Sequence, residues 1–148
     1  MSGVFLVVKD AKGVLHEVAG DPPHVTVFYS GDAVPRKNLV TLGNHWMRYY
    51  WPAEDCDLVL DRAQISSFTK ADGTERHDVL LLLNDPLRIV HHRKFAKEEL
   101  GVGDDVLFMM IPHVTAAACA TREEAETRTR EFEAHLPLTV RVVGYTVN

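Results

Sequence analysis

The chain of 148 residues has little cysteine, no long apolar run and no excess of positive charge. Cys56 and Cys119 are too few for a disulfide framework and match no Cys-x-x-Cys metal or redox motif. The longest apolar stretches, such as 79–83 and 106–112, are far shorter than the ~20 residues that cross a bilayer. Lys9 interrupts the first apolar segment before a signal-peptide core can form. These absences predict a soluble cytoplasmic protein with no membrane partner.

The charge balance excludes a further class of partner. The chain has 16 Lys and Arg against 21 Asp and Glu, a formal charge of −5, so no broad positive field is available to hold duplex DNA. With 46% apolar and 25% charged residues, the chain has the composition of a single globular domain covering 1–148. The eight histidines are unusual, because histidine titrates near neutrality and often serves in proton transfer or metal binding.

Hydrophobic periodicity and turn residues predict an alternation of strands and helices. Strands are expected over 4–9, 14–18, 24–29, 56–68, 76–83, 106–118 and 138–147. Helices are expected from Pro35 to before Pro52, from Pro86 to about Leu100, and from a Thr121 cap to about His135. Turns are expected at 10–13 and 71–74, the second joining two strands into a hairpin.

The tetrapeptide Pro-His-Val-Thr occurs twice, beginning at Pro23 and Pro112. In each half of the chain it lies in a predicted strand that is followed by a helix and a further strand. Two such units, each burying one sheet face against a helix, would bring the two tetrapeptide strands near each other. The sequence therefore predicts an α+β domain with an approximate two-fold axis and a cleft along it.

The two tetrapeptides carry the predicted catalytic residues: His24, Thr26, His113 and Thr115. Successive side chains of a strand point to opposite faces, so each strand offers an imidazole and a hydroxyl about 7 Å apart on one face, with valines toward the core. A phosphodiester needs one imidazole to accept a proton from the attacking oxygen and another to protonate the leaving oxygen. Hydroxyl donors hold the non-bridging oxygens as their charge builds. This chemistry needs no metal and no cofactor.

At the motifs His24-Val25-Thr26 and His113-Val114-Thr115 the chain resembles the 2H phosphoesterase superfamily. The resemblance implies a two-lobed fold with two antiparallel sheets, outer helices and a pseudo-two-fold central cleft. It also implies metal-independent action on 2′,3′-cyclic phosphates, 2′-5′ linkages, RNA 3′ ends or cyclic oligonucleotides. The compact chain is most similar to small phage members that destroy the cyclic-oligonucleotide signals of bacterial anti-phage defence (CBASS).

We therefore predict a phosphodiesterase of cyclic di- or trinucleotides that would serve viral evasion of such immunity. The alternatives are a 2′,3′-cyclic phosphate, 2′-5′ oligoadenylate or RNA-end phosphodiesterase, and a nucleotide-binding module without catalysis. A symmetric pair of motifs leaves open which histidine is the base and which is the acid. The oligomeric state also stays open.

Four residues of the first and last strands are candidates for substrate binding: Phe5, Lys9, Arg141 and Tyr145. Strict alternation places them opposite the most apolar positions of their strands, where an aromatic ring could stack on a base and a cation could meet phosphate. An amphipathic strand facing solvent would explain them equally well. Phe28 could lie on the histidine face or in the core, whereas Trp46 is expected in the core. His91 and His92 point about 100° apart on a helix, so no metal site is predicted there.

Overall fold

The computed structural model describes residues 2–30, 33–49, 57–101 and 111–148. Within these ranges six strands and three helices form an α+β fold, which confirms the predicted class. In chain order they are β1 (Ser2–Asp10), β2 (His24–Ser30), α1 (Arg36–Tyr49), β3 (Asp57–Thr69), β4 (Glu75–Leu83), α2 (Leu87–Leu100), β5 (His113–Cys119), α4 (Arg122–Glu133) and β6 (Leu138–Val147). No helix in these ranges has the length and apolar character of a membrane span.

The strands form one closed antiparallel ring in the order β1–β2–β5–β4–β3–β6. We call β6, β1, β2, α1 and α2 the first half, and β5, β4, β3 and α4 the second half. The halves join where Val25 of β2 pairs with Val114 of β5, and where Asp57–Leu60 of β3 pairs with β6. The prediction of two separate sheets is therefore wrong, because these two junctions make a single continuous sheet.

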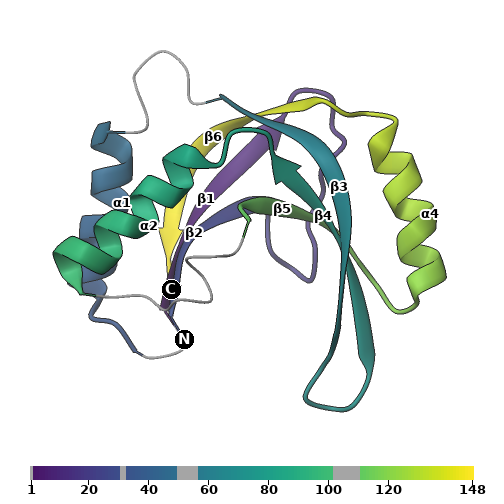
Figure 1. Ribbon diagram of the computed structural model, residues 1–148, viewed down its shortest axis with the longest axis horizontal. Coiled ribbons are helices and arrows are strands. Elements are labelled where there is room, and N and C mark those ends of the chain that lie inside the picture. Colours follow the sequence, from purple (N-terminus) through teal and green to yellow (C-terminus); the bar gives the residue numbers. More distant parts are fainter. Residues whose placement is uncertain (1, 31–32, 50–56, 102–110) are drawn as a thin grey trace.

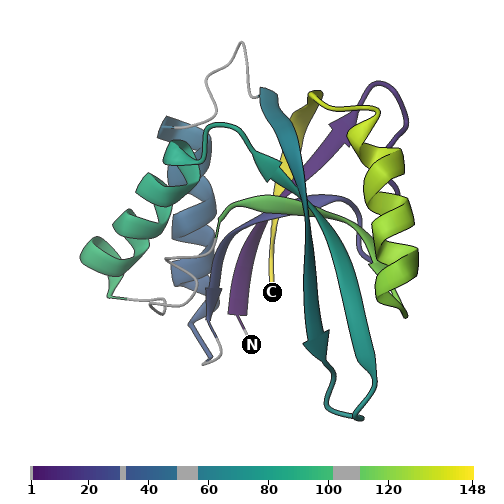
Figure 2. The same ribbon diagram turned by 45° about the vertical axis from the view of Figure 1, so that its right-hand side comes forward.

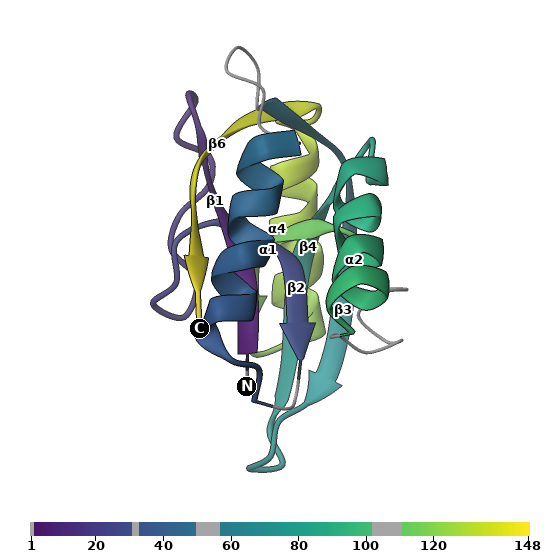
Figure 3. The same ribbon diagram turned by 90° about the vertical axis from the view of Figure 1, so that its left-hand side faces the viewer.

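The helices cover the outer face of the ring at opposite ends (Figure 1). In the first half α1 contacts β1 and β6, while α2 lies beside α1 and contacts β2 (Figure 3). In the second half α4 contacts β3, β4 and β5, and the β3–β4 hairpin extends beyond the other strands (Figure 2). Trp46 of α1 is fully buried, as expected, among strand valines and leucines that form the core between helices and sheet.

Most predicted elements are confirmed within one or two residues, and their ends have local causes. The Thr121 hydroxyl accepts the Glu124 N–H at 3.2 Å and caps α4. Gly101, with φ of 64°, ends α2 in the left-handed region that favours glycine. The predicted turn joins β3 to β4 through Gly73, whose φ is 86°.

The predicted strand over 14–18 does not form. The Asp10 carboxylate accepts the N–H groups of Val14 at 3.0 Å and Leu15 at 2.7 Å, and so holds the chain in a loop. The strand predicted over 106–118 is described only from His113 onward, and its earlier part lies outside the described residues.

Among the β-bulges of the ring, those on β2 and β6 change which face a residue named in the sequence predictions occupies. On β2, Val4 pairs with Phe28 and Phe5 pairs with Thr26, so Val27 is an extra residue. Phe28 consequently turns into the core, where its exposure is 1%. The second bulge, on β6, affects a predicted substrate-binding residue and is described with the site.

Candidate active site

The two tetrapeptide strands meet at the middle residues of their motifs. Val25 and Val114 pair directly across β2 and β5, and both are completely buried. The flanking side chains turn to the other face of the sheet and are partly exposed: His24, Thr26, His113 and Thr115. Antiparallel pairing at Val25 and Val114 puts each histidine on the same side of the sheet as the other strand's threonine, and His24 lies close enough to His113 for its charge to lower the pKa of His113. The structure therefore brings the four predicted catalytic residues together.

The two histidines are held by the same backbone contact. Nδ1 of His24 lies 2.8 Å from the Pro22 carbonyl oxygen, and Nδ1 of His113 lies 2.8 Å from the Ile111 carbonyl oxygen. A carbonyl oxygen can only accept, so Nδ1 carries the hydrogen in both rings. Nε2 is then the nitrogen that takes a proton in the neutral ring or gives one in the charged ring. Each histidine is thus fixed in the tautomer that general acid–base chemistry needs.

The surroundings of the two histidines differ. Burial lowers the pKa of His113, and the nearby charges of Arg93 and His24 lower it further, against the opposing effects of the Ile111 carbonyl and Asp78. At neutral pH this favours the neutral form of His113, which is the form a general base requires. His24 instead meets the edge of the Phe5 ring, with ring centroids 5.3 Å apart.

Arg93 supports the first motif from behind the sheet. Arg93 is 4% exposed, and its guanidinium donates to the carbonyl oxygens of Thr26 at 2.9 Å and Val27 at 3.2 Å. Burial lowers the pKa of Arg93 to about 10, so it stays charged at neutral pH. The contact fixes the backbone at the β2 bulge, immediately after the His-Val-Thr motif.

Sequence reasoning considered the α2 helix only for a metal site at His91 and His92, and it did not single out Arg93. In the structure Leu87 is 58% exposed and His91 is exposed, whereas His92 and Arg93 are buried. A buried arginine cannot be found from apolar periodicity, because the pattern of apolar residues does not mark a charged residue as part of the buried face.

Phe5 is the one predicted substrate-binding residue that reaches the motif. It pairs across β1 and β2 with Thr26, and Val7 pairs with His24, so all four side chains share a face. A cavity of about 300 Å³ opens beside His24. It is lined by Phe5, Val7, Asp21, Pro22, His24, Thr146 and Asn148.

Lys9 and Arg141 lie farther along the same strands. They pair across β1 and β6, both are exposed, and neither lines the cavity. Arg141 makes an ion pair with Asp57 at 3.4 Å. Four residues of extended strand, about 13 Å, separate Lys9 from Phe5. The two cations could meet a long ligand but not one confined to the motif.

Tyr145 is not brought to the site. On β6, Val7 pairs with Gly144 and Val8 pairs with Val142, so Val143 is an extra residue that reverses the alternation. Tyr145 therefore faces α1, where its hydroxyl donates to Asn44 Oδ1 at 3.0 Å.

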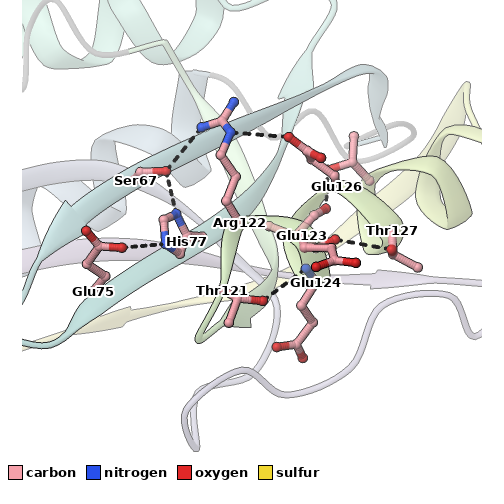
Figure 4. A network of polar contacts seen from close by, with 11 residues as sticks. Ser67, Glu75, His77, Thr121, Arg122, Glu123, Glu124, Glu126 and Thr127 are labelled. Atoms are coloured by element: carbon pink, nitrogen blue, oxygen red, sulfur yellow. Dashed lines mark hydrogen bonds and ion pairs between the residues drawn. The ribbon is translucent and has the colours of Figure 1, made fainter.

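His77 belongs to a separate polar network on the face covered by α4 (Figure 4). Its Nδ1 lies 2.7 Å from Ser67 Oγ and its Nε2 lies 3.3 Å from Glu75 Oε2, an order of groups also found in serine nucleophile triads. The ring is only 6% exposed, however, and Arg122 of α4 lies 3.5 Å from the same hydroxyl. The network therefore ties the β3–β4 hairpin to α4.

The site combines two imidazoles, two hydroxyls and an adjacent cavity on one face of the sheet, which is the set that acid–base cleavage of a phosphodiester requires. Among the described residues no three His, Cys, Asp or Glu side chains gather as metal ligands. No protein-family model matches the sequence, and a comparison with curated proteins finds no match. What the site does must therefore be argued from its geometry.

Proposed function

We propose that the chain is a metal-independent phosphodiesterase of the 2H type that cleaves nucleotides. Cyclic di- or trinucleotides are the favoured substrates, and 2′,3′-cyclic phosphates, 2′-5′ oligoadenylate or RNA ends are the alternatives. The observation that carries the proposal is the Val25–Val114 pair, because it sets two His-x-Thr motifs side by side in antiparallel register.

The surrounding strands support a two-lobed arrangement of this type. In the first half β1 places Phe5 opposite Thr26 and Val7 opposite His24. In the second half β4 places Leu80 opposite Thr115 and Leu82 opposite His113. Each motif is thus flanked on its outer side by two apolar residues at equivalent positions, as expected for halves related by an approximate two-fold axis.

The unequal surroundings of the histidines support different roles for them. Nε2 of neutral His113 accepts the proton of the attacking oxygen, either from water or from a neighbouring 2′-hydroxyl of the substrate. A new P–O bond forms as the bond to the leaving oxygen breaks, and His24, acting as the general acid, donates the proton from its Nε2 to that leaving oxygen. The hydroxyls of Thr26 and Thr115 donate to the non-bridging oxygens, where negative charge increases in the transition state.

The test is turnover in EDTA at neutral pH on cyclic di- and trinucleotides, 2′,3′-cyclic mononucleotides and 2′-5′ oligoadenylate, with products identified by mass spectrometry. His24→Ala and His113→Ala should each lower turnover by about 10²–10⁴-fold. His135→Ala, which changes an exposed histidine beyond the end of α4, is the matched control and should retain activity. Ligand binding without turnover would show that the chain is a nucleotide-binding module and not an enzyme. Activity that appears only when zinc is added would refute the mechanism.

A further inference from the structure

We propose that the cavity beside His24 is a nucleobase site that selects guanine, an inference that rests on the proposed nucleotide substrate. The cavity of about 300 Å³ is at the lower end of ligand pockets, so it suits one base rather than a whole dinucleotide. It includes His24 in its wall, so a base held there belongs to the nucleoside whose oxygen His24 protonates. That nucleoside is the leaving group.

The cavity offers one wall for stacking and a fixed set of polar groups. Phe5 supplies the aromatic surface, and base stacking on such a ring is tolerant of sequence. Thr146 pairs directly with Phe5 across β1 and β6, so its hydroxyl shares that face. Asn148 is held by backbone hydrogen bonds with Gly3 at 3.0 and 3.4 Å. Recognition of one base rather than another must come from the polar groups.

Asp21 supplies a carboxylate to the cavity, and its backbone is held by a hydrogen-bonded turn. Two hydrogen bonds of 3.0 and 3.1 Å between Val18 and Asp21 close a tight turn, whose central residues Ala19 and Gly20 have φ of 52° and 84°. The next residue, Pro22, has a restricted φ and provides the carbonyl that orients His24. A single short segment thus positions both the Asp21 carboxylate and the His24 ring.

A carboxylate only accepts hydrogen bonds, so it selects a base that presents donors. The Watson–Crick edge of guanine carries two adjacent donors, the N1–H and the N2 amino group, which can meet both carboxylate oxygens. Its O6 is an acceptor suited to the Asn148 amide or the Thr146 hydroxyl. Adenine presents one amino group beside N1, an acceptor that would face the carboxylate without a hydrogen. The charge and placement of Asp21 therefore favour guanine over adenine.

The second half lacks the same aromatic wall. Leu80 occupies the position opposite Thr115 that Phe5 occupies opposite Thr26. Guanine recognition is therefore expected on the His24 side, and a substrate with two different bases should be cleaved preferentially at the linkage whose leaving nucleoside is guanosine.

The test is calorimetric titration of the full chain with 5′-GMP and 5′-AMP in EDTA, because these mononucleotides bind without needing turnover. The wild type should bind GMP at least about 10-fold more tightly than AMP, as expected for a paired bidentate contact. Asp21→Asn should abolish this preference, and Glu17→Gln, which removes an exposed carboxylate from the same loop, should preserve it. Unchanged melting temperatures would show that both variants fold.

Equal affinities for GMP and AMP, no binding of GMP at millimolar concentration, or a preference that survives in Asp21→Asn would each overturn the base site. These results are separable from the proposed function. Turnover without guanine preference refutes the base site alone, whereas guanine preference without turnover on any substrate refutes the phosphodiesterase and leaves the site as a binding pocket.

Discussion

The two halves of the ring present the same motif in different settings. Both motifs bury a valine, leave a histidine and a threonine half-buried, and hold the imidazole through the carbonyl two residues earlier. His24 lies at the wall of a cavity beside Phe5, whereas the pKa of His113 is lowered by burial and by the charge of Arg93. A repeated backbone arrangement thus places the two histidines in different surroundings.

This difference teaches that register and reactivity have separate causes. The Val25–Val114 pair fixes the positions of the two histidines, and both histidines occupy equivalent positions relative to it. The residues around each ring decide which proton state is favoured, and these residues are not repeated between the halves. Each prediction below perturbs one side of this comparison.

The largest effect is expected with an activated substrate, which distinguishes the general acid from the general base. A p-nitrophenyl ester of a nucleoside 3′-phosphate has a leaving group that needs no protonation. His24→Ala should therefore lose less than about 10-fold in kcat on this ester, while His113→Ala should still lose about 10²-fold or more. Release of p-nitrophenolate measures both rates. Equal losses in the two variants would contradict the assignment, and a reversed order would exchange the roles.

The next effect concerns Arg93, whose charge reaches His113 although its contacts lie on β2. Arg93→Met leaves the Thr26 and Val27 carbonyls without their buried donor and should lower the free energy of unfolding by about 2 kcal/mol or more. Loss of the nearby positive charge should raise the pKa of His113, so the acidic limb of the kcat/KM profile should move to higher pH. Urea denaturation and the pH profile measure the two effects.

Lys94→Met is the matched control, because it removes an exposed cation from the next position of α2. It should leave both the unfolding free energy and the acidic limb nearly unchanged. A pH profile of Arg93→Met identical to that of the wild type would show that Arg93 acts on β2 alone.

The sequence predicted the four motif residues because strand alternation is unbroken between each histidine and its threonine. Only the two side-chain positions and the intervening valine are needed for that prediction, and the structure retains this pattern in both strands. Phe28 and Tyr145 could not be placed in the same way. Each follows a bulge, and one extra residue reverses the face of every side chain after it. Periodicity does not reveal where a bulge occurs.

The residues that support the site could not be predicted from the sequence, for a different reason. Arg93 and Asp21 act through contacts with segments distant in the chain or across a turn, so no local pattern marks them. Asp21 was recognisable only as part of a break before two prolines. The closure of the sheet through β3 and β6 is equally non-local, because strand pairing between residues about 80 positions apart leaves no periodic trace.

A smaller effect is expected from the histidine pair beneath the helices, which only the first half has. His92 is fully buried with Nδ1 3.1 Å from Nδ1 of His45, and burial, followed by the charges of His45 and Arg93, lowers its pKa to about 3. In the unfolded chain the pKa of His92 is near its ordinary value of 6.5, so the unfolded chain binds a proton on His92 in a pH range where the folded chain does not. Stability should therefore fall by about 2 kcal/mol as pH decreases from 6.5 to 5.

His92→Leu should flatten this dependence, because it removes the group that only the unfolded state protonates in this range. Urea denaturation at pH 7.5 and pH 5 measures the change in the free energy of unfolding between these two pH values. His91→Leu changes the exposed neighbour on α2 and should retain the wild-type slope. The same pH sensitivity in His92→Leu and the wild type would assign the effect to other groups.

The smallest effects are expected from Phe5 and Tyr145, two aromatic residues that strict alternation predicts on equivalent faces of their strands. Tyr145→Phe removes the hydrogen bond to Asn44 and should lower the free energy of unfolding by about 0.5–1 kcal/mol, with no change in KM. Phe5→Leu removes the ring beside His24 and should raise KM several-fold while altering kcat little, because stacking acts on bound substrate and transition state alike. Steady-state kinetics on one substrate compares them directly. A KM increase in Tyr145→Phe would place its ring in the substrate path, which the β6 bulge excludes in this structure.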